Sequence, residues 1–348
     1  MLKDKIGQML IVGFDGMSLH PDDAIVQAIL RQQIGGVILF DYHFQKQTYA
    51  RNIENPEQLC RLTAQLQSYA RQAREAIPLF IGLDYEGGRV NRLKEDRGFP
   101  PARSAQDIGN SSIEEANKEA VQMAKTLVSA GINLNFAPLL DLNNNPENPV
   151  IAKLERSFSA DPGKVSAYAG LFSRIYREHG IVSVYKHFPG HGSSQGDTHA
   201  GFVDVTNTWQ AAELEPYYHL LPNSEQIMVM TAHVVHEGLD KTGLPASLSA
   251  AITADLLRNK LNFHGVIVTD DLQMKAISDN YNLRDTLRLA INAGADVLIF
   301  GNQLVEEPYD PSQLVDMIYD LVMRGQVAES RIHESYQRIL KLKKNFFN

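Results

Sequence analysis

Eight short apolar runs recur along the 348 residues, and segments with helical spacing lie between them. The runs are continuously apolar rather than alternating, which is typical of strands covered on both faces of a parallel sheet. This alternation predicts an α/β fold, a single (β/α)8 barrel of the TIM type that forms one domain over residues 1–348. A doubly wound open sheet shows the same alternation, and periodicity alone does not distinguish the two. The runs are Gln8–Phe14, Gly35–Phe40, Leu79–Asp84, Ile132–Pro138, Ile181–Lys186, Ile227–His233, Gly265–Asp271 and Asp296–Gly301.

Local signals mark the helices between these runs. Ser112 and Glu115 form a capping-box pattern, and apolar residues follow them at helical spacing. Gly131 then stands where the residue after a helix end belongs. The last segment, Glu329–Asn348, predicts an amphipathic helix with a basic end. Packing as the final barrel helix is favoured over attachment to a membrane.

The composition argues against several classes of protein. Lys and Arg number 33 against 41 Asp and Glu, so the net charge of -8 argues against a nucleic-acid-binding protein. The single cysteine, Cys60, excludes an intrachain disulfide and a cysteine-based zinc site. The apolar run near the N-terminus is too short for a signal peptide, and no apolar stretch is long enough for a membrane span. We therefore expect a cytoplasmic protein.

Polar and charged residues gather at the carboxyl ends of the apolar runs. Random placement would scatter them over both ends, whereas the active site of a barrel enzyme lies at the carboxyl end of its strands. The sequence thus predicts an active site at this end. The residues are Asp84, Glu86, Arg89 and Arg92 after the third run, Asp141 after the fourth, Lys186–His199 after the fifth, His233 after the sixth, and Asp270 with Asp271 at the end of the seventh.

The densest of these groups, Lys186–His199, reads KHFPGHGSSQGDTH. Its glycines and Pro189 exclude a regular helix and predict a polar loop. An aspartate beside an imidazole fixes its tautomer and stabilises its cation, so Asp197 and His199 predict a general acid/base. A solvated loop without a catalytic task is the alternative. A metal site at the loop's three histidines and Asp197 is disfavoured, because Pro189 and Gly190 break the i, i+4 presentation of zinc-binding histidines.

Two carboxylates end the seventh run, and a further acidic segment follows the third. Because alternate residues of a strand face opposite sides, we expect only one of Asp270 and Asp271 to face the interior while the other caps the next helix. Capping and hydration without catalysis is the alternative. The segment Asp84–Arg89 lacks the glycine spacing of a phosphate-binding loop. Its acids and arginine around two glycines better suit hydrogen bonds to polyol hydroxyls.

These motifs together resemble glycoside hydrolase family 3, and within it the single-domain β-N-acetylhexosaminidases that trim cell-wall fragments. The loop signature of that group is Lys-His-Phe-Pro-Gly-His-Gly, four variable residues and Asp-Ser/Thr-His, which Lys186–His199 matches throughout. The resemblance covers nearly the whole chain in order. The other matching segments are Asp84–Leu93, Asn135–Asn143, Glu155–Pro162, Thr231–Asp240 and Gly265–Ile277.

The resemblance implies roles for single residues. It makes Asp270 the nucleophile and His199 the general acid/base, with Asp197 as the partner of His199. One carboxylate and a His–Asp pair would thus replace the two carboxylates of most retaining glycosidases. The substrate-binding positions that it implies are Asp84, Arg92, Arg156, Lys186 and His187.

The activity that the resemblance implies is that of a retaining exo-β-N-acetylglucosaminidase of peptidoglycan recycling. Its substrates would be muropeptides of the GlcNAc-1,6-anhydroMurNAc type. We expect a monomer that uses no cofactor and no metal ion. The alternatives are a family 3 β-glucosidase or glycoside phosphorylase, a metal-dependent hydrolase of the amidohydrolase type, and a non-catalytic sugar-binding barrel.

The chain departs from the family pattern by an insertion of about residues 41–49. In the family, the second strand is followed almost directly by the segment that is here Ala50–Asn55. The added residues include Tyr42, Phe44 and Tyr49. Their rings either stack on sugar at the leaving-group side of the cleft or pack the insertion onto the barrel, and packing is favoured.

Overall fold

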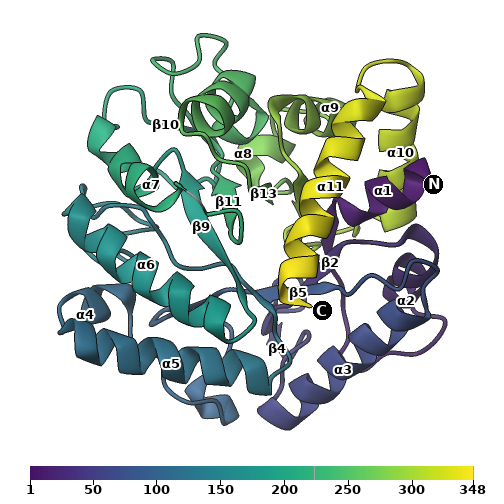
Figure 1. Cartoon of the computed structure of the whole chain (residues 1–348), viewed down its shortest axis with the longest axis horizontal. Helices are drawn as coiled ribbons and strands as arrows, with labels where there is room; N and C mark the ends of the chain where they lie inside the picture. Colours follow the sequence, from purple (N-terminus) through teal and green to yellow (C-terminus); the bar gives the residue numbers. More distant parts are fainter. Residues whose placement is uncertain (223, 348) are drawn as a thin grey trace.

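A computed structural model of the chain describes residues 1–222 and 224–347. Eight parallel strands pair in chain order and close into a barrel where β14 pairs with β1, with Leu10 opposite Leu298 (Figure 1). This closure confirms the (β/α)8 barrel and excludes the open sheet. The barrel strands are β1 (Leu10–Gly13), β2 (Gly36–Ile38), β5 (Phe80–Leu83), β8 (Leu134–Asn135), β9 (Val182–Phe188), β11 (Met228–Thr231), β13 (Val266–Asp271) and β14 (Val297–Phe300).

Helices lie between the strands and cover the outside of the barrel (Figure 1). The α-helices are α1 (Leu2–Gln8), α2 (Ala24–Gln27), α3 (Pro56–Gln72), α4 (Ala105–Gly109), α5 (Ile113–Ser129), α6 (Pro162–Glu178), α7 (Glu215–Leu220), α8 (Lys275–Ser278), α9 (Leu283–Ala293), α10 (Pro311–Met323) and α11 (Glu329–Phe346). The 3-10 and π-helical segments are η1 (Ala28–Gln32), η2 (Glu95–Arg97), η3 (Ala211–Leu214), η4 (Ala246–Leu248) and η5 (Ala251–Lys260). Within the described residues, no helix is long and apolar enough to cross a membrane.

The predicted ends of α5 are confirmed. The Ser112 hydroxyl accepts a hydrogen bond from the Glu115 amide at 3.2 Å, and the Glu115 carboxylate accepts one from the Ser112 amide at 3.2 Å. Gly131 follows the helix with a φ of 70°, a conformation that glycine adopts without steric cost. The final helix α11 packs against α1 on the outside of the barrel, as its amphipathic pattern predicts (Figure 1). Asn348, the last residue of that predicted helix, lies outside the described residues.

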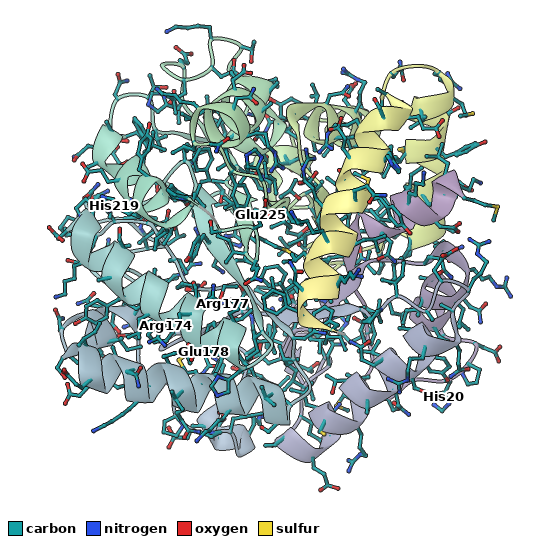
Figure 2. The ribbon with its side chains drawn as sticks, viewed as in Figure 1. His20, Arg174, Arg177, Glu178, His219 and Glu225 are labelled. Carbon is teal, nitrogen blue, oxygen red and sulfur yellow. The ribbon has the colours of Figure 1, made fainter. Side chains whose placement is uncertain are left out.

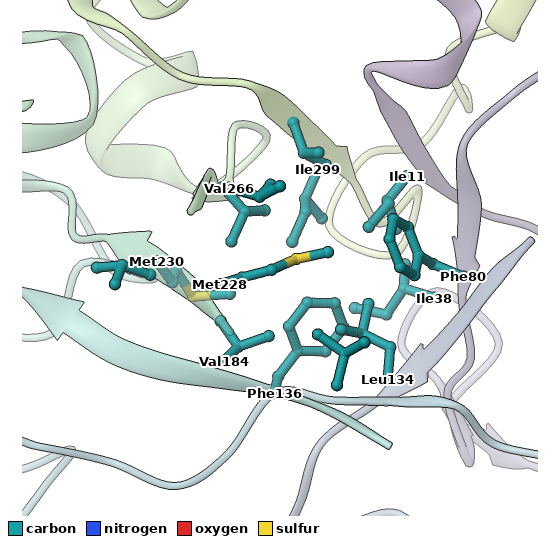
Figure 3. Packing of buried hydrophobic residues seen from close by; sticks show 14 of the residues in the cluster. Ile11, Ile38, Phe80, Leu134, Phe136, Val184, Met228, Met230, Val266 and Ile299 are labelled. Atoms are coloured by element: carbon teal, nitrogen blue, oxygen red, sulfur yellow. The ribbon is translucent and has the colours of Figure 1, made fainter. Parts of the chain in front are cut away.

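Apolar side chains from the strands fill the barrel interior, whereas charged side chains project outward from the helices. On α6, Arg174, Arg177 and Glu178 are exposed, and Arg174 pairs with Glu178 at 2.9 Å (Figure 2). Burial of the interior side chains supplies the main free energy of folding. The interior residues labelled in Figure 3 are Ile11, Ile38, Phe80, Leu134, Phe136, Val184, Met228, Met230, Val266 and Ile299.

The insertion after β2 forms an antiparallel hairpin of β3 (Tyr42–His43) and β4 (Thr48–Tyr49). The ring of Tyr42 meets that of Tyr49 edge-on at a centroid distance of 5.1 Å, so these two rings pack against each other within the insertion, a contact that differs from the predicted packing onto the barrel. Phe44 differs, because it lines a cavity at the mouth of the barrel. Two further short pairings are β6 (Tyr85–Gly87) with β7 (Val90–Asn91), and β10 (Val203–Asp204) with β12 (Val234–Val235).

Candidate active site

A cavity of about 260 Å³ lies at the carboxyl end of the barrel strands. Its walls come from residues far apart in the chain, so barrel closure is what assembles them. Four side chains of the apolar interior shown in Figure 3 also line this cavity and form its floor: Ile38, Phe136, Met230 and Ile299. Glu86, Arg89, Asp141 and His233 are not part of its lining. All eight residues to which the resemblance gives a role line this one cavity: Asp84, Arg92, Arg156, Lys186, His187, Asp197, His199 and Asp270.

A network of buried charges forms one wall of the cavity. The Lys186 ammonium lies 2.9 Å from Asp84 and 2.8 Å from Glu86. Arg92 pairs with Asp84 at 3.1 Å, and Arg156 holds Glu86 through two nitrogens at 2.7 and 2.8 Å. Burial alone would raise the pKa of Asp84, but the charges of Lys186 and Arg92 hold that pKa well below its usual value. The side chains of the network therefore stay ionised. Their donors and acceptors are held in place and can form hydrogen bonds with the hydroxyl groups of a ligand.

His187 is oriented by a carboxylate behind it. Its Nδ1 lies 2.6 Å from Asp141, which also accepts a hydrogen bond from the His191 amide at 2.8 Å. Burial would raise the pKa of Asp141, but the two histidines hold it below its usual value, so the carboxylate is an acceptor. Nδ1 of His187 therefore carries the proton, and its Nε2 is free to contact a ligand.

Asp197 and His199 pair at the mouth of the cavity. The Nδ1 of His199 lies 2.8 Å from Asp197, and the imidazole side chain is 58% exposed. Partial removal from water lowers the pKa of His199, but the hydrogen bond to Asp197 and the charge of Asp270 outweigh this and raise it overall. With Nδ1 engaged, Nε2 is the nitrogen available for proton transfer.

Asp270 and Asp271 both line the cavity, so the expectation that only one of them faces inward is wrong. The pairing of β13 with β14 shifts register between Val268 and Asp271, and such an irregularity breaks the alternation of sides. Asp271 also caps no helix. Its carboxylate accepts hydrogen bonds from the amides of Gln273 at 3.0 Å and Gly301 at 3.2 Å, which ties β13 to the loop after β14.

The loop that carries the histidines is held by residues that sequence reasoning did not select. The Glu213 carboxylate accepts a hydrogen bond from the Gly192 amide at 2.9 Å, and Asn148 donates to the His191 carbonyl at 2.8 Å. No motif marks Glu213 or Asn148 in the sequence. Asp141 and Glu86 had a signal, because each follows a strand, but their supporting roles depend on contacts across the barrel.

The three histidines of the segment Lys186–His199 each have a different partner, and His187 among them lies on β9. His187 contacts Asp141, His199 contacts Asp197, and the Nδ1 of His191 lies 2.7 Å from the Ser194 hydroxyl. Burial lowers the pKa of His191 to about 4, so this imidazole is neutral. Its contact with Ser194 stabilises the turn. Over residues 1–222 and 224–347, no group of three or more His, Cys, Asp or Glu side chains is arranged to hold a metal ion.

Comparison with known proteins agrees with this architecture. The model of the glycosyl hydrolase family 3 N terminal domain matches residues 1–342. The chain belongs to glycoside hydrolase family 3. Beta-hexosaminidase A of Pseudoalteromonas piscicida is 34% identical over 343 residues, which cover 91% of this chain and 54% of that protein. A beta-hexosaminidase of Shewanella frigidimarina is 38% identical over 283 residues, which cover 78% of this family 3 chain and 76% of the relative.

Solved structures superpose on nearly the whole chain. A β-N-acetylglucosaminidase of Paenibacillus sp. str. FPU-7 matches with a TM-score of 0.88 and 33% identity over 99% of this chain and 62% of that chain. A β-N-acetylhexosaminidase of Beutenbergia cavernae matches with a TM-score of 0.84 and 28% identity over 99% of this chain and 98% of that chain. The family 3 chain thus spans about half the length of the Pseudoalteromonas relative and less than two thirds of the Paenibacillus chain.

Proposed function

We propose that the chain is a retaining exo-β-N-acetylglucosaminidase. It removes terminal non-reducing N-acetylglucosamine from muropeptide fragments of the GlcNAc-1,6-anhydroMurNAc type, in peptidoglycan recycling. The observation that carries the proposal is that Asp270 and the Asp197–His199 pair line one cavity whose wall is an ionised network suited to hydroxyl groups. The names of the relatives, beta-hexosaminidase and β-N-acetylglucosaminidase, support the choice of sugar.

In the proposed reaction, Asp270 attacks the anomeric carbon and forms a glycosyl ester while the bond to the leaving oxygen breaks. His199, as the imidazolium, donates the proton that this oxygen needs. The neutral His199 then takes a proton from water, which attacks the ester and releases the sugar with its original configuration. Because His199 is cationic before it donates, no second anion has to lie beside the nucleophile, unlike the carboxylate pair of most retaining enzymes.

The cavity shape supports cleavage at a chain end. Its floor is closed by apolar side chains of the barrel interior, including Phe136 and Met230, so a sugar chain has no exit beneath the site. The proposed binding residues stand above this floor and contact the terminal sugar: Asp84, Arg92, Arg156, Lys186 and His187. A closed floor with convergent polar groups favours one terminal residue over an internal one.

A panel of p-nitrophenyl β-glycosides tests the sugar, and GlcNAc-1,6-anhydroMurNAc fragments test the substrate class. We expect turnover of the N-acetylglucosaminide well above that of the glucoside, and release of N-acetylglucosamine from the fragment, detected by mass spectrometry. Preference for glucoside would reject the proposed sugar. Formation of the sugar 1-phosphate when phosphate is added would identify a phosphorylase, and loss of activity on exhaustive chelation would identify a metal-dependent enzyme.

The proposal also places the enzyme in the cytoplasm as a monomer. Cell fractionation with an antibody against the protein tests the first statement. Light scattering of the purified chain tests the second, with one species near the chain mass of 38.8 kDa as the expected result.

A further inference from the structure

The β3–β4 hairpin presents one aromatic ring to the cavity. Phe44 lines the cavity and is 54% exposed. Leu304, from the loop after β14, lines the same cavity and is 39% exposed. The two side chains form an exposed apolar wall of this cavity, on a different level from the buried charges of Asp84 and Lys186.

The exposure of Phe44 is built into the hairpin, because the residues on both sides of it are held. His43 is buried, and its Nε2 lies 2.8 Å from the Asp15 carboxylate in the loop after β1. Gln45 donates to the Gln303 carbonyl at 3.0 Å in the loop after β14. With its two neighbours fixed to different loops, Phe44 has little freedom to fold back onto the barrel.

A second set of contacts ties the same three loops together. Arg51 donates to the Asp15 carboxylate at 2.7 Å and to the Asn302 carbonyl at 2.7 Å. Its guanidinium is buried, which makes this a rigid connection between the loops after β1, β2 and β14. The wall that carries Phe44 and Leu304 is therefore preorganised. An apolar contact with a rigid wall contributes more to binding, because little conformational entropy is lost when the ligand binds.

The exposure of the side chains shows how deep each residue lies in the cavity. Lys186 and His187 are deep in the cavity, with side chains 3% and 8% exposed. His199, Phe44 and Leu304 are at the mouth, with exposures of 58%, 54% and 39%. A general acid has to reach the oxygen between the two sugars, so residues at the level of His199 face the leaving group.

We propose that Phe44 and Leu304 form the leaving-group subsite, an apolar platform for the C–H face of the pyranose ring next to the cleaved bond. Pyranose rings carry C–H groups on their faces and hydroxyls on their edges, so a flat apolar surface contacts the face while the edge stays in water. This inference rests on the proposed glycosidase activity and adds the residues that select the leaving group.

The test compares two substrates that share one sugar but differ in the leaving group. The β-1,4-linked disaccharide of N-acetylglucosamine places a sugar on the platform, whereas N-acetyl-β-glucosaminyl fluoride leaves a single atom there. In Phe44→Ala we expect the ratio of kcat/KM on the disaccharide to kcat/KM on the fluoride to fall about tenfold. Leu304→Ala, which changes a different loop, should lower the same ratio by about threefold.

Tyr49→Ala is the matched control. Tyr49 belongs to the same hairpin, is 53% exposed and meets the Tyr42 ring edge-on as Phe44 does, but it does not line the cavity. In Tyr49→Ala, the ratio of kcat/KM on the disaccharide to kcat/KM on the fluoride should equal that of the unchanged enzyme. This control distinguishes a contact of Phe44 with the leaving group from a general disturbance of the hairpin. An unchanged ratio in Phe44→Ala, or an equal fall in Tyr49→Ala, overturns the inference.

Further outcomes separate the inference from the proposed function. If the unchanged enzyme hydrolyses neither substrate, the proposed function fails, and the ratio is then measured with the fluoride and disaccharide of the sugar that it does accept. If p-nitrophenyl glycoside alone loses activity in Phe44→Ala while the disaccharide does not, the platform binds aryl groups and the sugar assignment is overturned.

Discussion

Asp270 and Asp271 are neighbours on β13 and line the same cavity, yet their pKa values are shifted in opposite directions. Burial would raise the pKa of both carboxylates. The charges of His233, His187 and His199 hold the pKa of Asp270 below its usual value, whereas burial raises the pKa of Asp271 to about 7. Carboxylates with diverging pKa values have different tasks, and only Asp270 is poised as an anion at every pH near neutrality.

Asp270→Ala should lower turnover by about 10⁴-fold or more, because it removes the proposed nucleophile. The fold should persist, which thermal unfolding can check. A mechanism-based fluorosugar should label the unchanged enzyme within the peptide Gly265–Met274. A label in any other peptide would assign the nucleophile to a different residue.

His199→Ala should lower kcat/KM about 10²- to 10⁴-fold on substrates with a poor leaving group, because their leaving oxygen needs a proton. With a 2,4-dinitrophenyl glycoside, whose leaving group departs without protonation, the rate of the first step, formation of the glycosyl ester, should fall far less in this variant. Burst kinetics can separate that step from hydrolysis of the ester. Equal losses in the first step for both leaving groups would refute an acid role for His199.

Asp197→Asn should shift the pH dependence of the enzyme. The proposed acid works as the imidazolium, so kcat/KM falls as the pH rises through the pKa of His199. Asp197 raises that pKa, and its neutralisation should therefore move the alkaline limb of the profile to lower pH. An alkaline limb that stays in place would show that it belongs to another group.

Asp141→Asn should weaken binding of the terminal sugar while leaving the charged network intact. An amide in place of the carboxylate no longer fixes the proton on Nδ1 of His187. The proton can then lie on either ring nitrogen, and Nε2 is no longer held as an acceptor for the ligand. We expect kcat/KM to fall about tenfold or more. Direct NMR observation of the His187 ring nitrogens should show a change of tautomer, which a purely structural defect would not produce.

Lys186→Met should destabilise the fold by about 3 kcal/mol, because Asp84 and Glu86 lose a buried counter-charge. Denaturant unfolding measures this loss. The matched control is Lys3→Met, whose exposed partner Asp316 lies 2.6 Å away and whose loss should be far smaller, because water screens an exposed ion pair. A loss as small as that of the control would refute the structural role of Lys186.

The same variant gives a pH test of the network. In the unchanged protein the pKa values of Asp84 and Glu86 are lowered, so their stabilising effect is present above the unfolded pKa of about 4 and is lost as pH falls. The difference in stability between Lys186→Met and the unchanged protein should therefore shrink as pH falls below about 4, toward the lowered pKa values of the folded state. A difference that stays constant with pH would show that packing, not charge, accounts for the loss.

The amino-acid pattern predicts the alternation of strands and helices and the end of the strands at which the chemistry lies, whereas closure of the sheet into a barrel is seen only in the structure. Apolar runs and helix caps are local properties, because each depends on residues close together in the chain. The predicted capping box at Ser112 and the predicted turn at Gly131 are both confirmed. The polar residues after each run predict a site at one end of the barrel, because parallel strands end together. The cavity lined by Asp84, Lys186 and Asp270 agrees with that prediction.

Tertiary structure alone decided how these residues are supported and aimed. The shift in register on β13 turned both Asp270 and Asp271 toward the cavity, since alternation holds only for regular pairing. Glu213 supports the loop of Lys186–His199 from a segment with no motif, and Asp15, Gln45 and Gln303 hold Phe44 at the mouth of the same cavity. These are contacts between loops that only barrel closure brings together, and no local pattern encodes a distance across the barrel.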